Sequence, residues 1–207
     1  MKIIGLDFSI NKPAACIYDN GKYDFMSWPF GLSERIKDIF KEAGVTVIDR
    51  EDEKYKGKDS SIKMRWEVEN AMYLTDLIIT SLPDGDPKEW QVIFEGISYA
   101  SSGNMAIQLG GYKYVLMEAF FNETVPWDNM TTYAPITLKK TAGASKKGMG
   151  KKEMIDSFIL KNDNYLSKTI NKNPDLFKKK TGTWIDHLDD LVDAYFCVAT
   201  FKEKNGI

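Results

Sequence analysis

The sequence predicts an α/β fold, with a mixed central sheet of about five strands and helices on both faces. Three short apolar segments joined by tight turns occupy the first 28 residues, and segments with helical spacing separate two later apolar segments, at 90–94 and 130–138. The hydrophobic content of 43% and the aromatic content of 13% over 207 residues are enough for one core. We therefore expect a single domain over residues 1–207.

The N-terminal segments predict an antiparallel meander. Residues 2–8 form the first expected strand, and Lys12-Pro13 interrupts it before a second strand over residues 14–19. Asn20-Gly21 is a strong hairpin turn pair, so we expect the third strand over residues 22–28.

Two helices are expected next. Ser33 is a suitable cap for a helix that runs through Lys41, and Gly44 ends it. A longer helix begins at Ser61, and the apolar residues at helical spacing in it are Ile62, Trp66, Tyr73 and Leu77. The charged residues 45–60 between these helices match no element and suggest an insertion.

One strand and one helix are expected in the middle of the chain. The segment WQVIF at 90–94 follows a Pro- and Gly-containing loop and ends in Glu95. Residues 96–104 are small and polar and predict a loop. The helix that follows has an apolar face made of Met105, Leu109, Tyr112, Leu116, Ala119 and Phe120.

The C-terminal third predicts a strand at 130–138, a helix at 151–160 and a last helix at 183–201. Residues 161–182 are polar, so we expect an irregular segment and a second insertion there. The last helix has an apolar stripe that would pack on the core, made of Trp184, Leu188, Leu191, Tyr195 and Ala199.

The charge of the chain is unevenly distributed. Residues 139–180 contain twelve lysines and four acidic residues, a local balance of +8, so the rest of the chain sums to −10 against the overall −2. No acidic residue lies between 139 and 152, a stretch that contains Lys139, Lys140, Lys146, Lys147, Lys151 and Lys152. Such a stretch is either a solvated loop or a surface that contacts phosphates, since lysines bind a nucleic-acid backbone without reading its sequence.

The cysteines and the absence of long apolar runs favour a cytoplasmic protein. Cys16 and Cys197 lie far apart in apolar surroundings and predict reduced core residues. The chain enters a strand at once, without the pattern of a signal peptide, and no run approaches the length of a membrane span. We therefore expect no membrane partner.

Two acidic residues stand out because they lie at apolar strands. Asp7 interrupts the first strand, where a carboxylate is costly unless a partner or a cation compensates it. Glu95 ends the strand at 90–94, at the edge where ligands gather in sheets covered by helices. Each residue alone is equally consistent with a structural role, as a partner of a buried lysine or as a solvated loop acid.

The last helix carries four aspartates, Asp186, Asp189, Asp190 and Asp193, within an arc of about 100°. Four crowded carboxylates repel each other, which is tolerable on an exposed face and more favourable when cations neutralise them. The spacing does not choose between the pairs Asp186/Asp189 and Asp190/Asp193. His187, the only histidine, is either a helper of such a site or a partly exposed helix residue.

Four passages in series resemble the RuvC-type Holliday junction resolvases of the ribonuclease H-like superfamily, including phage-borne members. They are GLDFSINKPAACI at the first hairpin, FEGISYASSGNMAIQLGG around Glu95, YAPITLKKTAGASKKGMGKKEM in the lysine-rich part, and DDLVDAYFCVAT in the last helix. The resemblance covers nearly the whole chain. It departs from the family at the two possible insertions and at Ser9, where many relatives have glycine.

The resemblance implies a ribonuclease H-like fold and a metal-binding set of Asp7, Glu95, Asp190 and Asp193. It prefers the second aspartate pair because Ala194 follows Asp193, as in the D-x-x-D-A pattern of the family. Oxygen ligands suit Mg²⁺, with Mn²⁺ as a substitute. Two ions per site are expected to support a nick that leaves a 5′-phosphate.

The resemblance also implies partners. We expect four-way DNA junctions as substrates. The six lysines between 139 and 152 would contact their phosphates, and Tyr99 would stack on a base at the centre of the junction. The two-fold symmetry of a junction implies a homodimer with the helix at 103–121 near the contact. A phage-borne member would act in the host cytoplasm.

Three other functions are open at this point. A broader branched-DNA or flap endonuclease would use the same fold and residues. A sugar- or acetate-kinase-like phosphotransferase shares the opening strand pattern but needs a second similar domain, for which 207 residues leave no room. A non-catalytic DNA-binding protein would not need all four acidic residues. Cleavage-site preference and any helicase partner are not apparent from the sequence.

Overall fold

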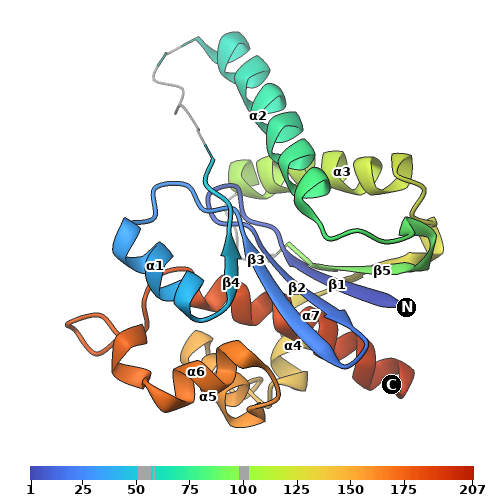
Figure 1. Ribbon diagram of the computed structural model, residues 1–207. Helices are drawn as coiled ribbons and strands as arrows, with labels where there is room; N and C mark the ends of the chain where they lie inside the picture. The colour runs from blue at the N-terminus through green and yellow to red at the C-terminus, as the bar shows by residue number, and fades with distance from the viewer. Residues whose placement is uncertain (51–56, 58, 98–102) are drawn as a thin grey trace.

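A computed structural model describes residues 1–50, 57, 59–97 and 103–207 (Figure 1). Over these residues, one mixed sheet has six strands in the order β4-β3-β2-β1-β5-β6. The sequence predicted a mixed sheet of about five strands. The strands are β1 (Lys2–Asp7), β2 (Ala14–Asp19), β3 (Lys22–Ser27), β4 (Val45–Val47), β5 (Trp90–Glu95) and β6 (Met130–Tyr133).

The predicted antiparallel meander is confirmed. Strand β2 pairs antiparallel with both β1 and β3. Asn20 and Gly21 both have positive φ, 48° and 85°, as a two-residue hairpin turn of this kind requires. The short strand β4 was not predicted; it lies at the start of the unassigned stretch 45–60 and pairs parallel with β3.

Helices cover both faces of the sheet, as predicted (Figure 1). One face carries α2 and α3, and the other carries α7 with the smaller helices around it. No helix in the described part of the chain is long and apolar enough to cross a membrane. The helices are α1 (Glu34–Glu42), α2 (Ser60–Ser81), α3 (Gly103–Asn122), α4 (Pro135–Thr141), α5 (Lys151–Lys161), α6 (Tyr165–Lys172) and α7 (Leu188–Asn205).

Helix α2 forms where it was predicted, but its buried face was predicted wrongly. Ile62 and Tyr73, placed on the packing face, are exposed, and the buried apolar residues are Ala71, Leu74 and Ile78. Only the C-terminal half of α2 reaches the sheet, and the N-terminal half runs out beyond it (Figure 1). An apolar pattern therefore continues along a part of the helix that the core does not cover.

The strand predicted at 130–138 is too long. Strand β6 ends at Tyr133, and Pro135 begins helix α4. Proline suits the first turn of a helix because its φ is already helical and the N–H it lacks would have no partner there. Lys139 and Lys140 consequently lie on a short helix and not in a loop.

The C-terminal region differs from the prediction in two ways. Residues 161–182 were expected to be irregular, yet they contain α6, whose first turn Asn164 caps by accepting a hydrogen bond from the Ser167 amide (2.8 Å). The last helix begins at Leu188 and not at Thr183. His187 precedes it with φ 75°, a left-handed conformation that the helix cannot continue through. Trp184 and Asp186 therefore lie outside α7.

Candidate metal centre

The sheet brings Asp7 and Glu95 together. Side chains alternate along a strand, so Ile4 and Leu6 of β1 pack toward α2 and α3, whereas Ile3 and Gly5 face α7. Asp7, two residues after Gly5, faces α7 as well. Strand β5 is parallel to β1, with Leu6 opposite Phe94, so the next residues along, Asp7 and Glu95, end neighbouring strands on the face that α7 covers.

Helix α7 supplies the third carboxylate because it lies very close to β1. A Cβ atom at Gly5 would collide with the Ala194 carbonyl oxygen and would lie 2.9 Å from the Cys197 Cβ. Glycine in a strand interior often marks such a close approach. Asp193 directly precedes Ala194, one turn before Cys197, so the helix face that rests on Gly5 also directs Asp193 toward Asp7.

The three carboxylates meet. One oxygen each from Asp7, Glu95 and Asp193 lies within 4.8 Å of the others. Burial, and then the charges of Glu95, Asp190 and Asp193, raise the pKa of Asp7 well above its usual range. Burial raises the pKa of Glu95, and burial with the charge of Glu95 raises the pKa of Asp193 strongly. We call these three residues the acid triad.

The acid triad fits a divalent metal ion. Three crowded and largely buried carboxylates are unfavourable as anions without a cation among them. All three supply hard oxygen donors, the ligands that Mg²⁺, Mn²⁺ and Ca²⁺ prefer in proteins. The cavity beside them has a volume of about 340 Å³ and is also lined by Asp190, Lys113, Lys139 and Lys151.

Asp190 lines the same cavity and is hydrogen-bonded to a buried histidine. Its Oδ2 lies 2.7 Å from the Nδ1 of His187, which is buried and whose Nε2 is bonded to the Ser27 hydroxyl. Asp190 thus has one oxygen bonded to an imidazole while its side chain lines the cavity. An imidazole paired with a carboxylate in this way orients metal ligands in other proteins.

The structure distinguishes the two aspartate pairs that the sequence left open. Asp190 and Asp193 line the cavity beside the acid triad, which we call the acid cavity. Asp186 pairs with Lys179 at 2.6 Å, and Asp189 pairs with Lys151. Burial alone would lower the pKa of Lys151, but the hydrogen bond and the charge of Asp189 raise it above its usual value.

Lys113 is a site residue that the sequence prediction missed. It is buried on α3, its Nζ donates to the Glu95 carbonyl oxygen (3.0 Å), and burial lowers its pKa to about 8. A signal was available: Lys113 lies four residues after Leu109 and three before Leu116, inside the apolar face predicted for this helix. A cation on a buried helix face needs anions nearby, and the acid triad supplies them.

The predicted DNA-contacting lysines are distributed around this cavity. Lys139 on α4 and Lys151 at the start of α5 line it. Lys140, Lys146 and Lys147 are exposed outside it, and Lys152 pairs with Asp156 at 2.5 Å. Tyr99, predicted to stack on a base, lies outside the described residues.

No protein-family model and no curated protein matches the chain. Among solved structures, the RuvC of Thermus thermophilus in complex with a Holliday junction substrate is similar over 99% of this chain and 96% of that chain, with 13% identity and a TM-score of 0.49. The fowlpox virus resolvase in complex with its substrate Holliday junction DNA covers 99% of both chains, with 20% identity and a TM-score of 0.41. Sequence identities and TM-scores at this level assign no role to any residue of the chain.

Proposed function

We propose that the chain is a metal-dependent, structure-selective DNA endonuclease that resolves four-way junctions by paired nicks leaving 5′-phosphates. The observation that carries this proposal is the acid triad, three carboxylates from β1, β5 and α7 within 4.8 Å of one another beside an open cavity. Lysines border the same cavity, so anionic metal ligands and phosphate-binding cations lie side by side. The resemblance of the four sequence passages to junction resolvases points to the same activity.

The residues that line the acid cavity would have separate roles. Asp7, Glu95 and Asp193, with Asp190 held by His187, would bind two Mg²⁺ ions, and Mn²⁺ would substitute. Such ions supply activation of water and stabilisation of the leaving 3′ oxygen. Lys139 and Lys151 would hold the phosphate against the cavity, and Lys113 would balance the charge of the acid triad when no cation is present.

The remaining lysines would bind the arms of the junction. Lys140, Lys146 and Lys147 are exposed on one segment between α4 and the start of α5, and Lys152 follows on α5. Their contacts would go to phosphates, so affinity would fall steeply with salt and would depend little on base sequence.

A homodimer would place two such sites on the two opposed strands of a junction. Helices α2 and α3 are joined by the hydrogen bond of Asn70 to Tyr112 (2.9 Å) and present an outer face with exposed apolar residues. These residues are Ile62, Met64, Val68 and Met72 on α2, and Ile107, Tyr114 and Phe121 on α3. Exposed apolar patches of this kind mark association surfaces, and a second copy of the chain is the occupant that the two-fold junction requires.

The test is a panel of end-labelled substrates, with four-way, three-way, flap and linear duplex DNA, incubated with and without Mg²⁺. We expect symmetric nicks near the branch point of the four-way junction, and products that ligase reseals because they carry 5′-phosphates. Equal cutting of flaps would favour the broader branched-DNA endonuclease. Binding without any cutting would favour a non-catalytic DNA-binding protein.

Mutations in the acid triad sharpen the test. Asp7→Asn and Glu95→Gln should abolish cutting and keep junction binding, whereas Asp38→Asn, an exposed residue of α1 outside the cavity, should leave both unchanged. Cutting by Asp7→Asn at the wild-type rate would refute the assignment.

A further inference from the structure

A second cavity lies beside the acid triad, and the proposed cleavage chemistry does not use it. Its volume is about 690 Å³. We call it the tryptophan pocket, lined by Lys151, Lys152, Ile155, Lys178, Trp184 and Asp189 among others. We propose that the tryptophan pocket binds an unpaired base of the DNA strand, next to the phosphate at the acid triad. The inference rests on the proposed function, because the base belongs to that substrate.

Trp184 is held in place by a short, well-bonded turn. Residues Lys178 and Trp184 form an antiparallel bridge, and the Lys179 amide donates to the Thr183 carbonyl oxygen (2.7 Å). Phe177 and Ile185, which flank this turn, are both buried in the core and are joined by an amide–carbonyl hydrogen bond of 2.9 Å. The half-buried ring is therefore presented by a turn that the core anchors at both ends, so little order would have to be gained when a ligand stacks on it.

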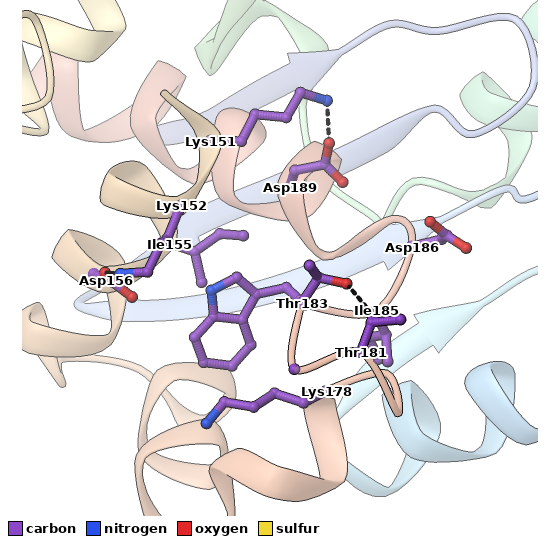
Figure 2. Close-up of a pocket in the computed structure, with 12 residues that line it drawn as sticks. Lys151, Lys152, Ile155, Asp156, Lys178, Thr181, Thr183, Ile185, Asp186 and Asp189 are labelled. Carbon is purple, nitrogen blue, oxygen red and sulfur yellow. Dashed lines mark hydrogen bonds and ion pairs between the residues drawn. The ribbon is translucent and has the colours of Figure 1, made fainter. Parts of the chain in front are cut away.

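The charges around the tryptophan pocket are balanced. Among the described residues that line it, three are lysines and three are aspartates. Lys151 pairs with Asp189, and Lys152 pairs with Asp156. Figure 2 shows these two pairs at the edges of the pocket, with Lys178 on the far side from Lys151. A neutral cavity of this kind suits an uncharged planar group better than a phosphate.

The remaining lining suits a nucleobase. Trp184 supplies an aromatic wall and Ile155 a buried apolar one, while the hydroxyls of Thr181 and Thr183 lie 2.9 Å apart at the rim. A base has two faces for stacking and an edge of hydrogen-bond donors and acceptors, and stacking on tryptophan is tolerant of sequence. The Lys178 ammonium now lies 5.5 Å from the centre of the Trp184 ring. A stacked base would displace it toward the strand's phosphates.

The position of the tryptophan pocket makes the base a neighbour of the reacting phosphate. Lys151 lines both this pocket and the acid cavity, and Asp189, its partner, directly precedes Asp190. A strand whose phosphate lies at the acid triad can therefore direct an adjacent base past Lys151 toward Trp184. Extruding a base costs least where its pairing is already weakened, so the pocket would favour a branch point over continuous duplex.

The experiment compares binding to four-way junctions without divalent ions, so that no strand is cut. The junctions are intact or carry one abasic nucleotide, placed in turn at each position flanking the branch point. We expect Trp184→Ala to weaken binding of the intact junction roughly 5- to 150-fold, and one abasic position to weaken wild-type binding similarly. The two losses should not multiply when combined, because they remove the same contact.

Two variants control the comparison. Trp184→Phe keeps an aromatic face and should retain most of the affinity, and Tyr165→Ala removes an exposed aromatic ring outside the pocket and should change nothing. If Trp184→Ala does not fold, Trp184→Leu, which keeps apolar bulk without an aromatic face, replaces it in the same series. The inference is overturned if no abasic position weakens wild-type binding, or if the two losses multiply. Failure of the proposed function is distinguishable, because the wild-type chain would then not cut the intact junction in Mg²⁺.

Discussion

At the scale of single residues, the acid triad is a source of instability that a bound cation would relieve. The pKa values of Asp7, Glu95 and Asp193 are all raised, chiefly by burial. A raised carboxylate pKa means that the folded chain holds protons that the unfolded chain releases. The free energy of unfolding therefore falls as the pH rises from about 4, where unfolded carboxylates ionise, through the raised values.

The first prediction concerns Asp7→Asn without metal. The amide keeps the shape of the carboxylate and removes its charge, so the variant should unfold at a higher temperature than the wild type at pH 8, with no difference near pH 3. Each 1 kcal/mol added to the free energy of unfolding raises the unfolding temperature by about 2–4 °C in a chain of this size. Thermal unfolding by circular dichroism measures it, and Asp38→Asn, at an exposed position of α1, serves as the control. If Asp7→Asn is less stable than the wild type at pH 8, other residues of the chain already neutralise the charge of the triad.

The second prediction concerns His187, which fixes one oxygen of Asp190. His187→Asn suits the left-handed backbone at this position, because asparagine tolerates positive φ, and it removes the imidazole. We expect the Mg²⁺ concentration for half-maximal cutting to rise about 10- to 100-fold, with the rate at saturating Mg²⁺ changed less. Cleavage assays over a Mg²⁺ series measure both. An unchanged Mg²⁺ requirement would mean that Asp190 needs no support from His187.

At the scale of elements, the contact between β1 and α7 sets the geometry of the acid triad. Gly5 lets the helix approach the strand, and the alternation along β1 then places Asp7 on the same face two residues later. The parallel register of β1 and β5 adds Glu95. One close helix–sheet contact and the register of two parallel strands thus position three carboxylates that are far apart in the sequence.

The third prediction tests that contact with Gly5→Ala. The added methyl group would meet the Ala194 carbonyl oxygen, a backbone atom that cannot rotate away. Overpacking of this kind costs about 1–3 kcal/mol, and relief by tilting α7 would carry Asp193 away from Asp7. We expect lower stability in urea and slower cutting that higher Mg²⁺ only partly restores. Gly103→Ala, where nothing lies within 4 Å of the added atom, is the matched control.

At the scale of the whole molecule, the two faces of the sheet have different roles. The α7 face carries the acid triad and the tryptophan pocket. The opposite face carries α2 and α3, which project an apolar surface away from the core. Under the proposed function, the first face would bind DNA and the second would bind another copy of the chain.

The fourth prediction follows from the spacing of Met64, Val68 and Met72 along the exposed side of α2. A Met64→Glu, Val68→Glu double variant should fold normally, because neither side chain is in the core. It should run as a monomer in sedimentation and should nick only one strand of a junction per binding event. The matched control is Leu160→Glu, an exposed apolar residue on α5. A wild-type chain that is monomeric at all concentrations would contradict the proposed dimer.

Sequence reasoning predicted the elements whose causes are local. Asn20-Gly21 determines a tight turn, and alternating and helical apolar spacings determine strands and helices, so the meander, β5, α3 and α5 lie close to where they were expected. Asp7 and Glu95 stood out for a similar local reason, since a carboxylate at an apolar strand is costly without a partner or a cation. The choice of Asp190 and Asp193 over Asp186 and Asp189 came from the resemblance to the resolvase family, and the role of all four as metal ligands stays a prediction.

The missed features depend on contacts between distant segments. The start of α7 at Leu188 reflects the left-handed His187, which is bonded to Ser27 on β3 and Asp190. The tryptophan pocket arises because Trp184, expected on the last helix, lies in a turn that Phe177 and Ile185 anchor in the core. The apolar face of α2 was misassigned because the helix pattern does not tell where the sheet ends.

The central claim is that Asp7, Glu95 and Asp193 hold divalent ions, and Mn²⁺ binding followed by electron paramagnetic resonance tests it most directly. The wild-type chain should remove free Mn²⁺ from solution, Asp7→Asn and Asp193→Asn should lose that binding, and Asp186→Asn should retain it. Equal Mn²⁺ binding by the wild type and by both triad variants would contradict the claim.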